Sequence, residues 1–187
     1  MQKIVEDALT AHNQGLDYLK DNTQVIIDIA KEFIESLEKG NKILFMGNGG
    51  SAADAQHLTA ELVGRFKKNR KALAAIALTT DTSILTSLAN DFGFEDVFSR
   101  QVEALAKPGD ILVGISTSGK SKNVLKALEM GKRNSLLTVG FLGRDGGELL
   151  KLSGLALTIP SQITAVIQEM HILAGHIICA IVENHFS

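Results

Sequence analysis

Short apolar runs alternate with longer segments of helical spacing after residue 42, and this alternation limits the fold more than any other feature. Five runs have the length of buried strands: Ile43–Met46, Leu73–Leu78, Ile111–Ile115, Leu136–Phe141 and Leu155–Ile159. Helical spacing marks the segments 52–66, 82–90, 95–106, 122–133, 146–152 and a last one at Ala165–Asn184. Strands that alternate with helices are typical of βαβ units. We therefore expect an α/β fold with a parallel sheet covered on both faces.

Two further helical stretches, at residues 2–20 and 22–39, precede the first strand, and Gly40 ends the second in the usual position. We expect this pair, within residues 1–40, to serve in subunit packing. The chain has only two prolines and shows no repeat, linker or break in composition. We therefore predict a single domain over residues 1–187.

Composition and charge exclude several classes of protein. The single cysteine, Cys179, permits no internal disulfide and favours a reducing compartment. The N-terminus does not resemble a signal peptide. No run approaches the ~18 apolar residues of a membrane helix, and His171–Val182 reads as a buried helix. With a net charge of −2, we predict a cytoplasmic protein without nucleic-acid or membrane partners. The basic run 65–71 is interpreted as a solvated helix end and loop.

A glycine-rich loop, Gly47–Ser51, follows the first strand directly. Glycines let a backbone turn and bring its N–H groups close to a ligand. Ser51 is expected to cap the next helix, with Asp54 three residues on in a capping-box arrangement.

A second loop, 116–121, follows the third strand and reads S-T-S-G-K-S. Four of its six residues carry hydroxyls: Ser116, Thr117, Ser118 and Ser121. Because these groups precede a helix N-terminus, where amides point outward, the loop predicts a phosphate site.

The same region, Gly114–Ser121, formally matches the nucleotide-binding pattern G-x-x-x-x-G-K-[ST] and would suggest an ATPase or kinase. Its position in mid-chain weakens that hypothesis. No later apolar strand ends in an aspartate suited to Mg²⁺, and Asp81, shortly after the run Leu73–Leu78, lies upstream of this loop. A nucleotide site would also leave the remaining polar residues without a role.

Those residues include His57 and Glu61, which are four positions apart and share one face of a helix. An imidazole beside a carboxylate suits a metal site or proton transfer. Arg65 continues the stripe and could meet an anionic substrate. On the last helix, Gln168 and His176 lie about 80° apart in projection, so both can reach one cavity. His171 faces elsewhere, and we interpret it as a core or interface histidine.

In this order and spacing, four motifs resemble the phosphoheptose isomerases of the sugar isomerase (SIS) domain family. They are GNGGSAADAQHLTAELVGRF, NDFGFEDVFSRQVEAL, GISTSGKS and IQEMHILAGH. The resemblance implies a three-layer αβα sandwich around a five-stranded parallel sheet. It also implies a homotetramer with active sites between subunits, and isomerisation of sedoheptulose 7-phosphate, a phosphorylated seven-carbon sugar, in bacterial surface-heptose synthesis.

Site roles follow from the resemblance residue by residue. Phosphate would be held by Ser116, Thr117, Ser118 and Ser121. The sugar would be contacted by Asn48, Gly49, Ser51, Arg65, Asp91 and Gln168. Zn²⁺ would be bound by His57, Glu61, Gln168 and His176. Glu61 and His176 would form the acid–base pair.

One position departs from the family pattern, because Val166 stands where the motif commonly has arginine. This puts affinity, substrate choice or site geometry in doubt more than the reaction class. Two alternatives stay open: a non-catalytic SIS protein that binds a phosphosugar or a replication initiator, and an isomerase of a different phosphosugar. The presence of Glu61 and His176 favours an enzyme, because the non-catalytic relatives lack both.

Overall fold

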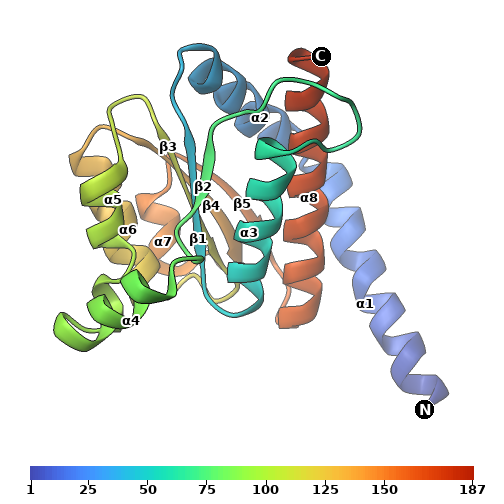
Figure 1. Ribbon diagram of the computed structural model, residues 1–187. Helices are drawn as coiled ribbons and strands as arrows, with labels where there is room; N and C mark the ends of the chain where they lie inside the picture. The colour runs from blue at the N-terminus through green and yellow to red at the C-terminus, as the bar shows by residue number, and fades with distance from the viewer.

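A five-stranded parallel sheet forms the middle layer of the molecule in the computed structural model, which describes all of residues 1–187 (Figure 1). The strands lie in the order β2-β1-β3-β4-β5. Their bounds are β1 Ile43–Gly47, β2 Ala75–Ala77, β3 Ile111–Ser116, β4 Leu137–Gly143 and β5 Leu155–Ile159. The predicted α/β sandwich with five parallel strands is confirmed.

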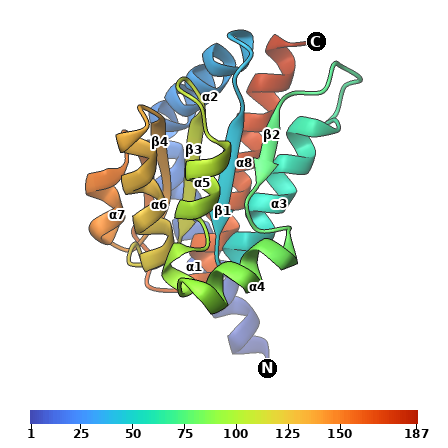
Figure 2. The same cartoon turned by 60° about the vertical axis from the view of Figure 1, so that its left-hand side comes forward.

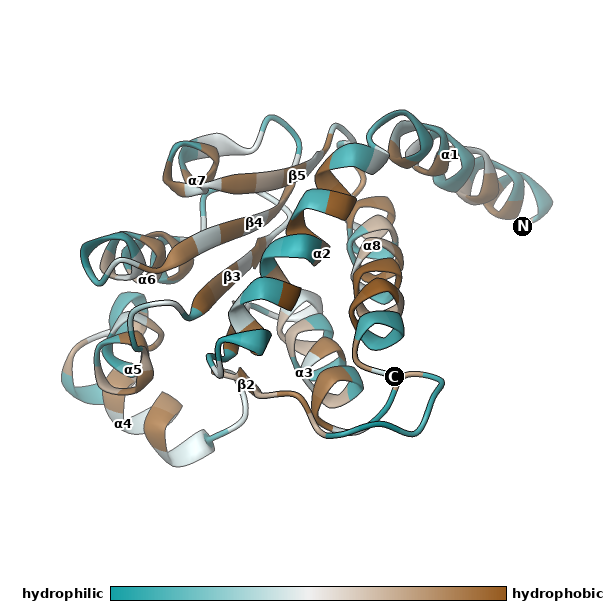
Figure 3. Cartoon of the chain, turned by 90° about the horizontal axis from the view of Figure 1, so that it is seen from above, coloured by the Kyte–Doolittle hydropathy of each residue, from teal (hydrophilic) through white to brown (hydrophobic).

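Helices cover both faces of this sheet, as the view from above shows (Figure 3). One face carries α1 Gln2–Asp21, α2 Thr23–Glu38, α3 Gly50–Val63 and α8 Thr164–His185. The other carries α4 Thr82–Asp91, α5 Ser99–Leu105, α6 Lys122–Arg133 and α7 Gly147–Leu152. After the 60° turn of Figure 2, α5 and α6 lie in front of the sheet and α8 behind it.

The strands are buried on both sides, which is why they read as continuous apolar runs. In β1, Ile43 and Phe45 enter the core under α2, α3 and α8, whereas Leu44 and Met46 enter the core under α5, α6 and α7. The two cores therefore meet only through the sheet itself.

The order in which the chain forms its strands reverses at β1, which creates a topological switch point between β1 and β3. From β1 the chain moves outward to β2, then returns to β3 on the other side of β1. In open parallel sheets, ligands bind beyond the carboxyl ends of the strands at such a point. The loops after β1 and β3, both singled out in the sequence, lie there.

Three elements differ most clearly from prediction. The expected strand over 73–78 is paired only at Ala75–Ala77, on the edge of the sheet. The expected helix over 95–106 is a 3₁₀ turn, η1 at Phe94–Asp96, followed by α5. The expected helix over 52–66 begins at Gly50 and ends at Val63, because distant polar contacts hold the following loop.

α8 has the length and mean hydropathy of a membrane span, contrary to the expectation that no segment comes close. Half of its most apolar window is buried inside the protein, where it packs against α1, α2 and α3. This is the pattern of an interior helix, so hydropathy alone is weak evidence for a span.

α1 leans away from the body toward the N-terminus, with little of its first half covered (Figure 1). Ile4, Val5 and Leu9 remain exposed on it. Its C-terminal half packs on α8, where Gly15 lies against Val166 and Met170.

Candidate active site

The loop after β1 is shaped by close backbone approach. A side chain on Gly47 would collide with the backbone of Ser51, and Gly49 has φ of +56°. The capping-box prediction was wrong: Gly49 is the N-cap of α3, and no side chain bonds there. Ser51 instead lies inside the first turn and is buried. Glycine geometry, rather than a serine cap, starts this helix.

The loop after β3 gathers its hydroxyl groups at the N-terminus of α6. Ser116 Oγ lies 2.9 Å from Ser121 Oγ and 3.5 Å from Ser118 Oγ. The backbone N–H of Lys120 donates to Ser118 Oγ at 3.2 Å. Gly119, with φ of +66°, lets the loop pack on the backbone of Gly146. Hydroxyls and helix amides together form a cradle suited to a phosphate.

Two asparagines join this cradle to the glycine loop across the switch point. Asn48 and Asn123 exchange two hydrogen bonds through their side-chain amides, both of 2.9 Å. Asn123 lies in the first turn of α6 and is buried. Sequence reasoning missed Asn123, since an asparagine at a helix start signals only a cap.

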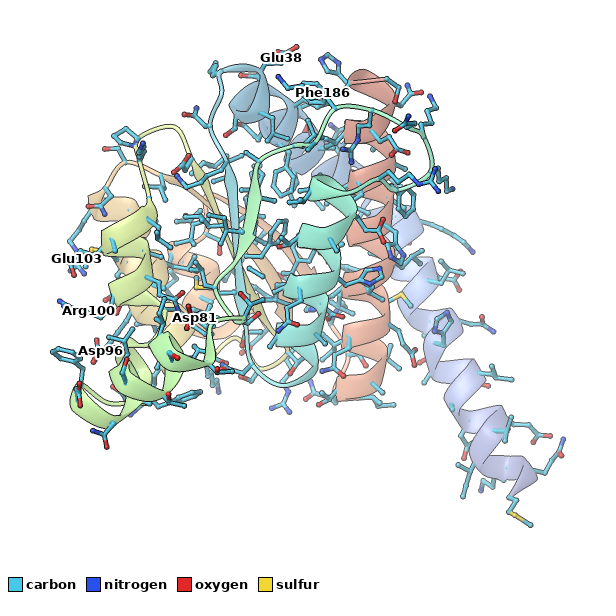
Figure 4. The ribbon with its side chains drawn as sticks, viewed as in Figure 1. Glu38, Asp81, Asp96, Arg100, Glu103 and Phe186 are labelled. Atoms are coloured by element: carbon cyan, nitrogen blue, oxygen red, sulfur yellow. The ribbon has the colours of Figure 1, made fainter.

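The nucleotide-binding hypothesis fails on the position of its aspartate. Asp81 caps α4, where its Oδ1 accepts a hydrogen bond from the Ile84 N–H at 2.9 Å (Figure 4). It follows β2 at the sheet edge, and β1 separates β2 from β3. Asp81 therefore does not stand beside the loop 116–121 in the way that the ligand of a nucleotide-bound Mg²⁺ requires.

Two imidazoles and a carboxylate converge where α3 packs on α8. His57 Nε2 lies 2.8 Å from His176 Nε2 and 3.4 Å from Glu61 Oε1. One ligand atom from each of the three residues fits within a span of 4.8 Å. Gly175 permits the close approach of the helices, because a side chain there would meet Leu58. We call His57, Glu61 and His176 the triad.

The triad fits a catalytic zinc ion. Nitrogen from histidine and oxygen from a carboxylate are ligands that Zn²⁺ prefers, and catalytic sites commonly use three protein ligands and leave one position open. Partial burial is the first reason that the pKa of His176 is lowered, and the nearby His57 lowers it further while Glu61 opposes. A neutral imidazole is the form that binds a metal.

The other residues predicted for the site, Gln168, Arg65 and Asp91, do not lie together with the triad. The amide of Gln168 packs directly on Gly50, eight residues or ~12 Å along α8 from His176. Arg65 is exposed in the loop after α3 and makes no hydrogen bond. Asp91, the last residue of α4, is also exposed and accepts a bond from the Asn90 side chain.

His171 is a core residue, as interpreted from the sequence. It is fully buried, and its Nε2–H donates to the Leu142 carbonyl at 2.9 Å. Burial lowers its pKa to about 4, against the opposing effect of that hydrogen bond. Val166 is buried against Gly15 of α1, so the departure from arginine lies in a helix contact.

The sequence assigned Asp54 only to a capping box and did not predict its place beside the triad, one turn before His57. Its Oδ2 is buried without a hydrogen-bond partner. Desolvation raises the pKa of Asp54 to about 6, although the charge of His57 lowers it. The only sequence signal was its place on the same helical stripe as His57 and Glu61.

Comparison with known proteins adds an independent line of evidence. A family model described as the SIS domain matches residues 5–143. A phosphoheptose isomerase from Pelobacter propionicus is 57% identical over 165 residues, covering 88% of this chain and 87% of the relative. One from Nitratiruptor sp. is 50% identical over all 187 residues, covering 100% of both chains.

Solved structures agree with these relatives. A phosphoheptose isomerase from Neisseria gonorrhoeae superposes with a TM-score of 0.93 at 40% identity, covering 98% of both chains. One from Francisella tularensis gives a TM-score of 0.94 at 34% identity, again covering 98% of both chains.

Proposed function

Because the chain belongs to the SIS domain family and, within it, to the phosphoheptose isomerases, which are aldose–ketose isomerases, we propose a defined reaction for it. It converts sedoheptulose 7-phosphate to D-glycero-D-manno-heptose 7-phosphate in the cytoplasm, with the whole chain acting as one domain. The convergence of His57, Glu61 and His176 within 4.8 Å is the observation that carries this proposal.

The reaction moves one proton between C1 and C2 and another between their oxygens, so it needs a base and an acid that can exchange roles. Glu61 is the base proposed for the carbon proton. Its side chain is largely buried, with 19% exposed, which limits competition from water. His176 serves the oxygens or opens the sugar ring.

Zinc is the proposed cofactor, held by His57, Glu61 and His176 with Gln168 as a fourth ligand. When bound, it supplies Lewis-acid polarisation of the substrate carbonyl. The two imidazoles and the carboxylate fit this ion by their chemistry. Gln168 joins the set by family resemblance, and its side-chain amide packs on Gly50 at the start of α3.

The loop 116–121 is the proposed phosphate site, through the hydroxyls of Ser116, Thr117, Ser118 and Ser121 and the amides of α6. Around the sugar we place the following contacts: Asn48, Gly49, Ser51, Arg65, Asp91 and Gln168. Binding energy from a phosphate far from the reacting carbons can hold those carbons in reactive geometry.

One substrate then has to reach both halves of the site. Ser51 lies in the first turn of α3, and Glu61 lies ten residues or ~15 Å further along the same helix. We propose that phosphate loop and triad from different copies complete each site in a homotetramer. The exposed apolar residues of α1, namely Ile4, Val5 and Leu9, support subunit packing by the N-terminal helices.

Turnover of sedoheptulose 7-phosphate by the purified protein, with and without added Zn²⁺, tests the proposal. Formation of the aldose that Zn²⁺ increases is the expected result. A folded, zinc-loaded protein without turnover would contradict it, and a screen of other ketose and aldose phosphates would then identify the substrate.

A further inference from the structure

A buried carboxylate far from the triad in sequence organises the loop that follows α3. Glu183, near the end of α8, is 2% exposed and accepts three backbone N–H bonds. The donors are Phe66 at 2.8 Å, Lys67 at 2.8 Å and Lys68 at 3.0 Å. Burial alone would raise the pKa of this carboxyl, but the three amides and the adjacent Arg70 lower it. The group therefore stays ionised and keeps all its acceptor capacity.

Arg70 closes the same loop from the other side. Its Nε lies 3.6 Å from Glu183 Oε1, and its side chain is 1% exposed. Its terminal nitrogens donate to the backbone carbonyls of Glu61 at 2.7 Å and Leu62 at 2.9 Å. These carbonyls belong to the last turn of α3, where no intrahelical donor remains. Arg70 thus fixes the end of the helix that carries His57 and Glu61.

The loop places an aromatic ring on the third triad member. The Phe66 ring lies 5.5 Å from the His176 imidazole, centroid to centroid, with 31° between the planes. Lys67 Nζ lies 5.0 Å from the centre of the same Phe66 ring. Because the Phe66 N–H is bound to Glu183, the ring position depends on that carboxylate.

We infer that Glu183 is a positioning residue for the triad, acting through Phe66 on His176 and through Arg70 on the end of α3. Neither Glu183 nor Arg70 needs to touch substrate for this role. A positioned imidazole keeps its nitrogen aimed at His57 and Glu61, whereas a free one can rotate away. Partners that orient metal-binding histidines typically change metal affinity or activity 10–100-fold when they are removed.

The test compares Glu183→Gln and Phe66→Leu with a matched control, Asp110→Asn. Asp110 is also buried, pairs with Lys42, and accepts backbone N–H bonds from Lys42 at 3.0 Å and Lys107 at 2.7 Å. It precedes β3 and contacts no triad residue. Each carboxylate-to-amide change removes one negative charge from an amide-binding pocket, so the general cost to folding is comparable.

Besides Tm, three properties are measured for each variant: Zn²⁺ affinity by competition with a chromophoric chelator, the NMR shifts of the His176 ring protons in the metal-free protein, and the steady-state kinetics, kcat and KM. We expect Glu183→Gln and Phe66→Leu to weaken Zn²⁺ binding and lower kcat by about 10-fold or more, with a smaller change in KM. Both should move the His176 ring resonances, because both remove or displace the Phe66 ring current. Asp110→Asn should lower Tm and leave the other readouts near wild type.

The inference is overturned if Glu183→Gln lowers Tm as Asp110→Asn does, while the His176 resonances and Zn²⁺ affinity stay at wild-type values. The kcat readout rests on the proposed function, but the other two do not. Absence of heptose-phosphate turnover in the wild type would therefore contradict the proposed function alone, and the NMR comparison would still decide the role of Glu183. Phe66→Leu keeps an apolar side chain at a half-buried position, so it preserves the test if Glu183→Gln fails to fold.

Discussion

The phosphate loop and the triad are built in opposite ways. The loop 116–121 takes its polar groups from six consecutive residues, from the last residue of β3 to the residue before α6, so its geometry is largely local. The triad joins His57 to His176 across 119 positions, through the packing of two helices. Changes in remote packing should therefore disturb the triad more than the loop, and changes in the loop should affect binding more than chemistry.

The largest expected effect comes from Glu61→Gln, which removes the proposed base and one metal ligand. General acid–base catalysis contributes about 10²–10⁴-fold, so kcat should fall by at least that range. Because the loop 116–121 is untouched, KM should change far less than kcat. Steady-state kinetics of the zinc-loaded variant measures both.

Glu103→Gln is the matched control, since Glu103 is an exposed carboxylate on α5 beside Arg100 (Figure 4). It should retain wild-type kcat and Tm. Wild-type kcat in Glu61→Gln would remove Glu61 from the reaction and leave the base to be found elsewhere.

Acid should lower the free energy of unfolding through His171, which is buried in α8. In the unfolded chain its pKa is near 6.5, but burial lowers it to about 4 in the folded protein. The stability linked to neutral His171 is complete above pH 6.5 and is lost as pH falls toward 4. For this shift the full loss is about 3 kcal/mol. Protonation would also leave Nδ1–H buried without an acceptor, since Nδ1 has no partner.

Urea unfolding at pH 7 and pH 4.5 measures this dependence. His171→Gln can keep the bond to the Leu142 carbonyl but cannot titrate, so its free energy of unfolding should fall less between the two pH values. His185→Gln is the control, because His185 is exposed and pairs with Glu38 at the surface. Equal acid dependence in wild type and His171→Gln would contradict the assignment.

Much of the fold follows from local sequence. Apolar runs buried on both faces predicted the parallel strands, and the spacing of His57 and Glu61 placed both on one helical face. The end of α3 was misplaced because its cause is remote. Glu183, more than a hundred residues later, captures the amides of residues 66–68 and prevents the helix from continuing.

The site was predictable only in its separate parts. Hydroxyls at a helix start predicted the cradle at 116–121, but nothing local pairs Asn48 with Asn123. The approach of His57 to His176 depends on Gly175 and Leu58 at the crossing of α3 and α8. Such contacts arise from tertiary packing, which a single sequence does not encode in any spacing.

Gly119→Ala should strain the phosphate loop while leaving the triad intact. Gly119 has φ of +66°, and an added side chain would overlap the Gly146 carbonyl. We expect about 2 kcal/mol of destabilisation, from backbone strain plus displacement of the loop. Urea unfolding gives the loss, and Zn²⁺ affinity should stay near wild type.

Gly40→Ala separates the cost of backbone strain from the cost of displacing the loop. Gly40 has φ of +79°, but there is open space around it. It should cost only the backbone strain, about 1 kcal/mol. If Gly119→Ala lowers the free energy of unfolding no more than Gly40→Ala does, the loop can move without cost. Its contact with Gly146 would then not fix the cradle.

The smallest effect is expected for Ser121→Ala, and it separates binding from chemistry most directly. Ser121 Oγ pairs with Ser116 Oγ at 2.9 Å, and each hydroxyl can turn its hydrogen toward a phosphate oxygen. A hydrogen bond to a charged group contributes about 1.5–3 kcal/mol, so its loss should raise KM by about 10-fold or more. The phosphate is bound alike in ground and transition states, so kcat should change little. Ser87→Ala, on the exposed face of α4, should leave KM unchanged. A fall in kcat at constant KM in Ser121→Ala would instead place the loop beside the reacting carbons, and the division of labour between loop and triad would no longer hold.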